Sequence, residues 1–197
     1  MLGYIAARPS LSVLEIGVAK GANAMRMMAF ADALGGRLRY VGIDLFGSLT
    51  QQIFQDEVRT EGKRPRGRAE TMNLLREQLG DEIALRMTLL EGFSGPLLAE
   101  LCHAGFTFDL IFIDGGHSYE VVREDWRRSG QLLAPGGVIV LDDYPNYGVG
   151  RAVEEIDRTK WNVRILEKMD HFRNLYHDLN PAAVLGFQLV EAIRLAG

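Results

Sequence analysis

The stretch SVLEIGVAKGANAMRMMAFA, residues 12–31, decides the fold. Its first five residues form a mostly apolar run that ends at Gly17, which predicts a buried strand followed by a turn. Apolar side chains then recur at the spacing of a helix, at Ala24, Met27, Met28 and Ala31. The segment therefore predicts a strand, a tight turn and a helix in that order.

The same alternation continues along the chain. Further short apolar runs are typical of strands at 38–43, 83–90, 108–113 and 138–141, with two more candidates at 161–166 and 183–190. Helical spacing recurs between them, at 70–80, 119–133 and 151–158. Strands that alternate with helices predict an α/β fold built on a parallel sheet with crossover helices.

Length and composition favour one globular domain that spans residues 1–197. Hydrophobic residues make up 47% of the chain, no apolar run is long enough to span a bilayer, and no secretory signal is visible, so we expect a soluble cytoplasmic protein. The net charge of −4 gives no support for binding to nucleic acid or to an anionic membrane. The single cysteine, Cys102, excludes an internal disulfide and is expected to be a small core residue.

Carboxylates follow the expected strands at one end. Asp44 ends the second strand, Asp114 ends the fourth, and the pair Asp142 and Asp143 ends the fifth. Buried parallel strands are normally apolar throughout, so a charge at a terminus indicates an end that opens to solvent or to a ligand. Since ligands of open α/β sheets bind outside the carboxyl ends of the strands, these residues and Gly17 predict a functional site along one edge.

The turn after the first strand indicates the kind of ligand. A dinucleotide fingerprint needs a glycine that lets the backbone approach a pyrophosphate, and Ala19 occupies that place between Gly17 and Gly21. Asp44 stands where a carboxylate accepts hydrogen bonds from the hydroxyls of a ribose, so we expect a nucleoside-containing ligand without a diphosphate. Glu15, a charge inside the first strand, is costly to bury unless it pairs with a backbone donor or a ligand ammonium.

Four segments in this order resemble the class I S-adenosylmethionine-dependent methyltransferases: VLEIGVAKG (13–21), YVGID (40–44), FDLIFID (108–114) and LLAPGGVIV (132–140). The resemblance covers about residues 10–160 and implies a Rossmann-like, doubly wound, mostly parallel seven-stranded sheet with helices on both faces. For the cofactor S-adenosylmethionine it implies that Glu15, Gly17 and Gly21 frame the methionine moiety and that Asp44 holds the ribose. Gly92, Phe93 and Ser94 would meet the adenine. The other implied cofactor contacts are Val18, Ala19, Lys20, Leu45 and Asp114.

Two further motifs, IDGGHSYE (113–120) and VLDDY (140–144), resemble the metal-dependent sugar O-methyltransferases that modify macrolides and related natural products. That resemblance implies a divalent cation on Asp114, Asp142 and Asp143, with His117 as the general base and a small hydroxylated molecule as substrate. Carboxylates that meet at adjacent strand ends would repel each other without a cation between them. Oxygen ligands favour Mg²⁺, with Mn²⁺ or Ca²⁺ as alternatives.

Other interpretations stay open at this point. Asp114 and the glycines after it can form a simple strand-ending turn, His117 can be a residue of a helix N-terminus, and Asp143 can bond only to its own turn. The alternative functions are a metal-independent methyltransferase, a hydroxylase-like relative that shares the IDGGH pattern, and a module that binds S-adenosylmethionine without catalysis.

The segment 46–69 is unusually long for a connection between a strand and a helix. We expect it to act as a lid over the acceptor, and a homodimer partner is the other candidate for covering the pocket. Its basic residues favour an acidic or phosphorylated acceptor, although a solvated charged loop explains them equally well. These residues are Arg59, Lys63, Arg64, Arg66 and Arg68.

Overall fold

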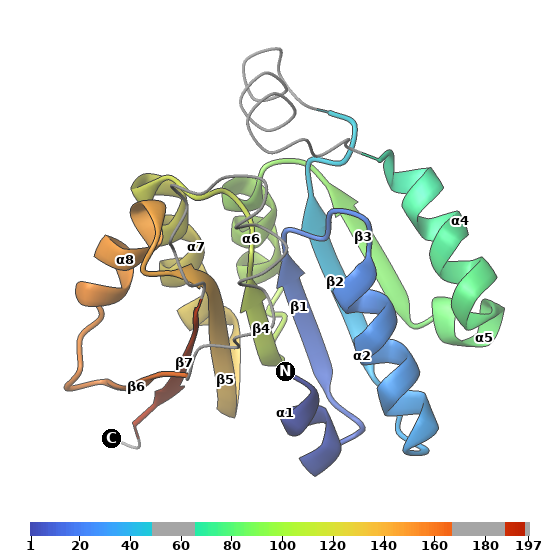
Figure 1. The fold of residues 1–197 in the computed structure, drawn as a ribbon, viewed down its shortest axis with the longest axis horizontal. Coiled ribbons are helices and arrows are strands. Elements are labelled where there is room, and N and C mark those ends of the chain that lie inside the picture. The colour runs from blue at the N-terminus through green and yellow to red at the C-terminus, as the bar shows by residue number, and fades with distance from the viewer. Residues whose placement is uncertain (49–65, 167–187, 196–197) are drawn as a thin grey trace, which may run out of the picture.

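A seven-stranded sheet with helices on both faces forms the body of the protein (Figure 1). The computed structural model describes residues 1–48, 66–166 and 188–195. The strand order is β3-β2-β1-β4-β5-β7-β6. The neighbouring pairs from β3 to β5 are parallel, whereas β7 pairs antiparallel with both β5 and β6. The expected Rossmann-like, doubly wound and mostly parallel sheet is therefore confirmed.

The winding direction of the sheet reverses beside its first strand. The chain runs outward from β1 to β3, returns to place β4 on the other side of β1, and continues to β5. The carboxyl ends of β1 and β4 therefore flank the switch point where ligands of such folds bind. The strands are β1 Ser12–Ile16, β2 Arg39–Asp44, β3 Met87–Glu91, β4 Phe108–Ile113, β5 Leu133–Tyr144, β6 Trp161–Ile165 and β7 Gln188–Arg194.

Helices cover the two faces of the sheet in separate groups. The helices α1 (Leu2–Ala7), α2 (Ala22–Ala33) and α4 (Arg68–Leu79) contribute to one hydrophobic layer. The helices α6 (Ser94–His103), α7 (Tyr119–Leu132) and α8 (Tyr147–Glu154) contribute to the other. In the part of the chain that the structure describes, no helix is both long and apolar enough to cross a membrane.

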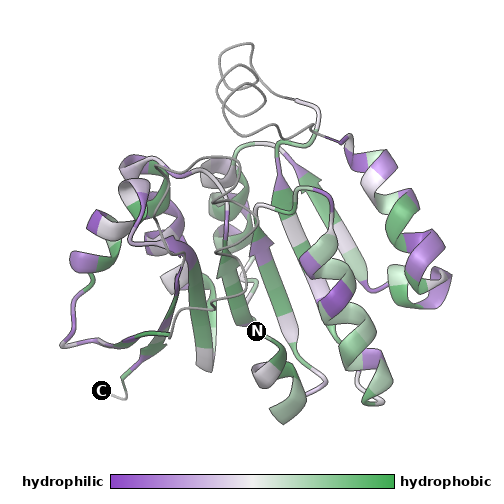
Figure 2. Cartoon of the chain, in the orientation of Figure 1, coloured by the Kyte–Doolittle hydropathy of each residue, from purple (hydrophilic) through white to green (hydrophobic). Residues whose placement is uncertain are grey.

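The strand β1 lies at the centre of both layers, and all five of its residues are buried. Val13 packs into the layer of α1, α2 and α4, whereas Leu14 and Ile16 pack into the opposite layer. A strand with apolar neighbours on both faces has no solvent side, which is why its sequence is apolar without alternation. Figure 2 shows the hydrophobic residues concentrated on these central strands.

The expected strand at 83–90 is wrong in its first half. Residues Asp81–Ala84 form the short helix α5, and β3 begins only at Met87. The amide of Ala84 donates to the carbonyl of Gly80 at 3.1 Å, and that of Leu85 donates to Asp81 at 2.9 Å. Ile83 packs against the same layer as α4 from this helical turn. The apolar residues Ile83 and Ala84 are compatible with a helical turn as well as with a strand. Periodicity over so few residues does not distinguish a helix from a strand.

The strand β5 is longer than the expected 138–141, because it begins at Leu133, directly after α7. The glycines at 136 and 137 do not separate a helix from a strand, as the sequence suggested, but lie inside an irregular strand. The register to β4 shifts there, since Phe108 pairs with Leu133 and Leu110 pairs with Val138. Gly136 has a φ of 73°, which lets the extra residues bulge out.

Three other elements differ from expectation. The helix expected at 151–158 begins four residues earlier, as α8 from Tyr147, and ends at Glu154. The strand expected at 183–190 is observed as Gln188–Arg194, while 183–187 lie outside the described residues. A short helix α1 precedes β1, where no helix was expected. The helix α1 was not predicted because its six residues are too few to show a helical period.

Most of the expected lid at 46–69 lies outside the described residues, including Arg59, Lys63 and Arg64. The last two basic residues of that segment are described, and both are ion-paired. Arg66 lies 3.1 Å from Glu70, and Arg68 lies 3.7 Å from Glu91. Arg68 already belongs to α4, so the connection to that helix is shorter than expected.

The amino ends of β1 and β4 are joined by a polar clamp at the edge opposite the carboxyl ends. The Oδ2 atom of Asp109 accepts hydrogen bonds of 2.8 Å from both the amide and the hydroxyl of Ser12. Its Oδ1 atom lies 3.3 Å from the guanidinium of Arg8. Burial alone would raise the pKa of Asp109, but the hydrogen bonds from Ser12 lower it below its ordinary value. The clamp fixes how the two central strands align.

We expect Asp109→Ala to lower the free energy of unfolding by about 1–3 kcal/mol, because it leaves the Ser12 donors without their charged acceptor. Urea denaturation followed by circular dichroism measures this change. The matched control is Glu82→Ala, whose exposed pair with Arg37 should be worth less than about 1 kcal/mol. Equal losses in the two variants would show that the clamp does not hold the strands.

Candidate functional site

The loops after β1 and β4 meet so closely that only glycine fits between them. Gly17 has a φ of 92°, and a Cβ atom added there would lie 1.9 Å from the carbonyl oxygen of Asp114. Its amide donates to Ile43 at 2.8 Å, which ties the same loop to β2. Gly17 therefore joins the carboxyl ends of three strands, and it lies at the switch point as expected.

The carboxylate of Asp44 orders the glycine loop. Its Oδ2 atom accepts hydrogen bonds of 2.8 Å from the amides of Val18 and Ala19, and its Oδ1 atom accepts one of 2.6 Å from Phe46. A carboxylate has about four acceptor positions, so three are already used. The expected bonds to both hydroxyls of a ribose would need one of these loop bonds to be exchanged. The sequence did not reveal this role in the loop.

The other residues of the loop are placed as the glycine pattern predicts. Gly21 has a φ of 77°, is buried, and donates from its amide to Val18 at 2.8 Å before α2 begins. Ala19 and Lys20 are exposed. Leu45, the residue after Asp44, is half-buried.

Strained backbone gathers at this edge of the sheet. Among the described residues, four that are not glycine have a positive φ, with values between 47° and 62°. Two of them follow β1 and β2, one is the penultimate residue of β5, and one begins α8. Such conformations cost roughly 1–3 kcal/mol each and collect at functional sites. The four residues are Ala19, Phe46, Asp143 and Tyr147.

Glu15 is a buried acid directly below the glycine loop. It is 1% exposed, and its Oε2 atom accepts a hydrogen bond from the hydroxyl of Tyr40 on β2. Its Oε1 atom is enclosed and has no hydrogen bond within normal geometry. Burial raises the pKa of Glu15 to about 7, although the contacts with Tyr40 and Asn23 oppose this rise. An enclosed acceptor that lacks a donor suits a ligand that brings one.

The loop after β3 lies beside the loop after β2. The amide of Gly92 donates to the carbonyl of Asp44 at 2.9 Å, and Gly92 has a φ of 148°. Phe93 is 54% exposed, and Ser94 begins α6. The segment expected to meet an adenine therefore reaches the same edge of the sheet as Asp44, with an aromatic side chain open to solvent.

A buried acid lies behind Ser94. Asp125 on α7 is 1% exposed, and neither of its carboxylate oxygens has a hydrogen bond within normal geometry. Burial raises the pKa of Asp125 to about 6, an effect that the Ser94 hydroxyl opposes and the charge of Glu124 increases. The sequence contains the signal for this residue, since position 125 follows Val122 at helical spacing on the apolar face of α7.

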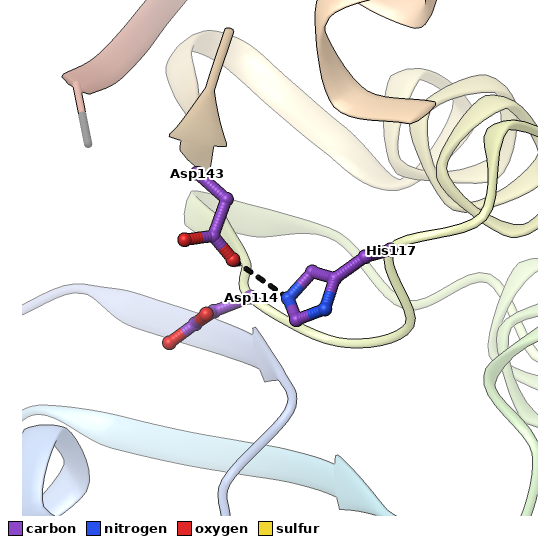
Figure 3. A group of neighbouring side chains, drawn as sticks. All are labelled: Asp114, His117 and Asp143. Atoms are coloured by element: carbon purple, nitrogen blue, oxygen red, sulfur yellow. Dashed lines mark ion pairs between the residues drawn. The ribbon is translucent and has the colours of Figure 1, made fainter. Parts of the chain in front are cut away.

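Asp114, His117 and Asp143 converge between the ends of β4 and β5 (Figure 3). Each can offer one ligand atom, and these atoms lie within 4.8 Å of one another. The Nε2 atom of His117 lies 2.6 Å from Oδ2 of Asp143, and both side chains are largely buried. Asp114 comes from β4 and Asp143 from β5, so the expected convergence of strand ends is observed for these two acids.

Asp142 contributes to the turn that carries Asp143. Its Oδ1 atom accepts a 2.8 Å hydrogen bond from the amide of Asp143, so it supports the turn. It lines the same hollow as Asp114 and His117 but is not part of the group of converging ligand atoms. Adjacent residues of an extended strand face opposite sides, but the strand is irregular here, since Asp143 has a φ of 62° and the register to β7 shifts between Leu141 and Tyr144.

The start of α8 holds His117 in place. The amide of Gly148 donates to the carbonyl of His117 at 3.0 Å, and the ring of Tyr147 stacks on the imidazole at 5.1 Å between centroids. A Cβ atom at position 148 would lie 2.1 Å from the amide nitrogen of Tyr119, so glycine is required there. Tyr147 is 62% exposed despite this contact. The sequence alone does not identify Tyr147 as a site residue, because a tyrosine near a turn is not distinctive.

Comparisons with known proteins agree with this geometry. The model of a family described as a methyltransferase domain matches residues 14–144, which is more than half of the chain. That segment runs from β1 to the end of β5 and contains the glycine loop and the converging acids. No curated protein matches the chain in sequence.

Solved structures of methyltransferases share the fold. A proposed rRNA methylase from Clostridium thermocellum has a TM-score of 0.63 at 15% identity, with 99% of this chain and 93% of that chain covered. The O-methyltransferase TomG of Streptomyces achromogenes is involved in tomaymycin synthesis and was solved with S-adenosylmethionine. It has a TM-score of 0.63 at 16% identity, with 99% of this chain and 78% of that chain covered. The O-methyltransferase of Bacillus cereus was solved with S-adenosylhomocysteine. It has a TM-score of 0.61 at 14% identity, with 98% of this chain and 78% of that chain covered. At these identities the likeness shows the fold alone.

We expect Asp125→Asn to stabilise the protein above pH 6 but not near pH 4. A raised pKa means that the folded state favours the protonated acid, so stability is lost as the pH rises through about 6. The gain at pH 8 should be on the order of 2 kcal/mol, measured by urea unfolding at several pH values. Glu77→Gln, an exposed acid on α4, is the matched control. A gain that is the same at pH 4 and pH 8 would contradict this account.

Proposed function

Because the chain belongs to the methyltransferase domain family, we propose that this site transfers a methyl group from S-adenosylmethionine to a hydroxyl of a small molecule. The observation that carries the proposal is the contact between Gly17 and the carbonyl of Asp114. It joins the loop expected to bind the cofactor to the group of Asp114, His117 and Asp143. A methyl donor on one side of this contact and an acceptor on the other would lie next to each other.

The described residues offer S-adenosylmethionine contacts along its whole length. Glu15 and the glycine loop suit the methionine end, since the groups with the largest influence on the buried Glu15 carboxyl include no cation. Asp44 suits the ribose, and the open ring of Phe93 beside Ser94 suits a flat adenine. When bound, S-adenosylmethionine supplies an electrophilic methyl group on a sulfonium.

The same group of residues suits a divalent cation. Asp114 and Asp143 supply the oxygen ligands that Mg²⁺, Mn²⁺ and Ca²⁺ prefer, and their ligand atoms are within 4.8 Å of each other and of His117. Asp142, which lines the same hollow, is the third acid of the proposed set. A bound cation would supply positive charge that lowers the pKa of the acceptor hydroxyl.

His117 is the base in this proposal. A neutral imidazole would take the proton of the acceptor hydroxyl as its oxygen bonds to the methyl carbon and the carbon–sulfur bond breaks, which would leave S-adenosylhomocysteine. Asp143, whose Oδ2 atom lies 2.6 Å from Nε2, stabilises the imidazolium that results. The stacked ring of Tyr147 orients the imidazole, and the hydrogen bond from Gly148 to the carbonyl of His117 fixes the backbone that carries it. The remaining contribution is alignment of oxygen, methyl carbon and sulfur.

The acceptor is proposed to be a small hydroxylated molecule of the sugar or natural-product type. TomG and the Bacillus cereus enzyme are O-methyltransferases of the same fold, and the exposed face of Tyr147 beside His117 offers a flat surface for a ring. A cytoplasmic location and a homodimer that covers the acceptor remain predictions. Neither nucleic acid nor a membrane is part of the proposal.

Methyl transfer from radiolabelled S-adenosylmethionine to a panel of sugars, macrolides and phenols tests the proposal, with and without a chelator. Transfer that stops with chelator and returns with Mg²⁺ supports the complete scheme. Methyl transfer that continues at the same rate in the presence of the chelator would mean that Asp114 and Asp143 have structural roles, and it would favour a metal-independent enzyme. Cofactor binding without transfer to any acceptor would favour a non-catalytic module.

We expect His117→Ala to lower turnover by roughly 100-fold or more while the affinity for S-adenosylhomocysteine stays within about twofold, because only the proton acceptor is removed. Single-turnover assays and calorimetry measure the two quantities. His103→Ala, an exposed histidine in the last turn of α6, is the matched control and should leave both unchanged. Unchanged turnover in His117→Ala would remove this residue from the mechanism.

A further inference from the structure

Tyr40 and Glu15 form a buried pair that reaches across two neighbouring strands. Glu15 on β1 is the register partner of Gly42 on β2, and Tyr40 precedes that glycine by two residues on the same face of the strand. A Cβ atom at position 42 would lie 2.8 Å from the hydroxyl oxygen of Tyr40 and 2.6 Å from Cγ2 of Val18. Because Gly42 has no side chain, there is room for the Tyr40 hydroxyl to reach the Glu15 carboxyl.

This pair lies directly under the glycine loop. Val18, whose methyl group fills the same gap at Gly42, donates its amide to Asp44. Tyr40 is 1% exposed and Glu15 is also 1% exposed, so no bulk water surrounds the pair. The side chains of Tyr40 and Glu15 are therefore packed against the underside of the loop that we assign to the methionine end of the cofactor.

The charged and polar groups around Glu15 leave its carboxyl poorly compensated. The phenol of Tyr40 on β2 and the amide of Asn23 on α2 favour the ionised form, whereas the charge of Asp44 disfavours it. On β4 the register partner of Glu15 is Phe112, which is apolar. The described groups with the largest influence on Glu15 include no cation. A cationic ligand would supply what this site lacks.

We propose that Tyr40 is a positioning residue that holds the Glu15 carboxyl under the glycine loop, so that binding of the cofactor's ammonium group expels one proton from Glu15. The inference rests on the proposed function, since it needs the methionine end of S-adenosylmethionine on this loop. Burial raises the pKa of Glu15 to about 7, so the protonated carboxyl predominates in the empty site below neutral pH. The arriving ammonium favours the carboxylate, and the O–H proton leaves to solvent while the ammonium keeps all of its own.

The affinity for the cofactor then depends on pH in a defined direction. Below pH 7 the empty site must lose a proton before the ionic contact forms, so the dissociation constant rises about tenfold per pH unit. Above pH 8 Glu15 is already ionised and the affinity is constant. The Tyr40 hydroxyl favours the ionised form, so its removal should extend the loss of affinity to higher pH.

The direct test is calorimetric titration of the purified protein with S-adenosylhomocysteine in buffers of different ionisation enthalpy. We expect release approaching about one proton per bound ligand at pH 6 and close to none at pH 8.5. In Glu15→Gln, an isosteric change, the release at pH 6 should disappear and binding at pH 8.5 should weaken. Binding by the wild type without proton release, or an equal release by Glu15→Gln, would overturn the inference while leaving the proposed function intact.

Tyr40→Phe separates positioning from simple packing. We expect its affinity for S-adenosylhomocysteine to fall roughly five- to tenfold at pH 7, with the difference shrinking above pH 8.5. Tyr4→Phe, partly buried in the same hydrophobic layer, is the control and should bind as the wild type does. A loss in Tyr40→Phe that is the same at every pH would assign Tyr40 to packing alone. No binding of S-adenosylhomocysteine by the wild type would overturn both this inference and the proposed function.

Discussion

The contact between Gly17 and the carbonyl of Asp114 is the constraint on which the site depends. A Cβ atom would lie 1.9 Å from that oxygen, so the loops after β1 and β4 can meet only because position 17 has no side chain. The contact places the glycine loop, with Asp44 ordering it, against the strand end that carries Asp114 and leads to His117. This close approach of two backbone segments thus joins the edge that we propose for the cofactor to the group of Asp114, His117 and Asp143.

Acidic side chains accumulate along this edge, and the structure accommodates each in a different way. Asp44 accepts hydrogen bonds from three backbone amides. Burial beneath the glycine loop raises the pKa of Glu15 to about 7. The Oδ2 atom of Asp143 lies 2.6 Å from Nε2 of His117. Asp114 completes the group with His117. An edge so rich in carboxylates favours cationic partners, which is consistent with a ligand that carries an ammonium and a sulfonium and with a divalent cation.

The sequence predicted the parts of the fold that depend on strong patterns. The strands β1, β2 and β4 were placed to within one residue, because strands buried on both faces are continuously apolar, and Gly17, Asp44 and Asp114 mark their ends. The roles of Asp44 in the loop and of Asp142 in the turn could not be read, since both depend on backbone amides brought in by folding. The Tyr40 contact with Glu15 was also hidden, because it follows from strand register.

The central claim is that one site binds both a nucleoside cofactor and a divalent cation, and calorimetry of the metal-stripped protein tests it most directly. Titration with S-adenosylhomocysteine and then with Mg²⁺ should give two binding steps. Asp143→Asn should lose the second step and keep the first, because Asp143 belongs to the converging group and not to the glycine loop. A nucleoside step without any Mg²⁺ step in the wild type, or no nucleoside step at all, would contradict the account.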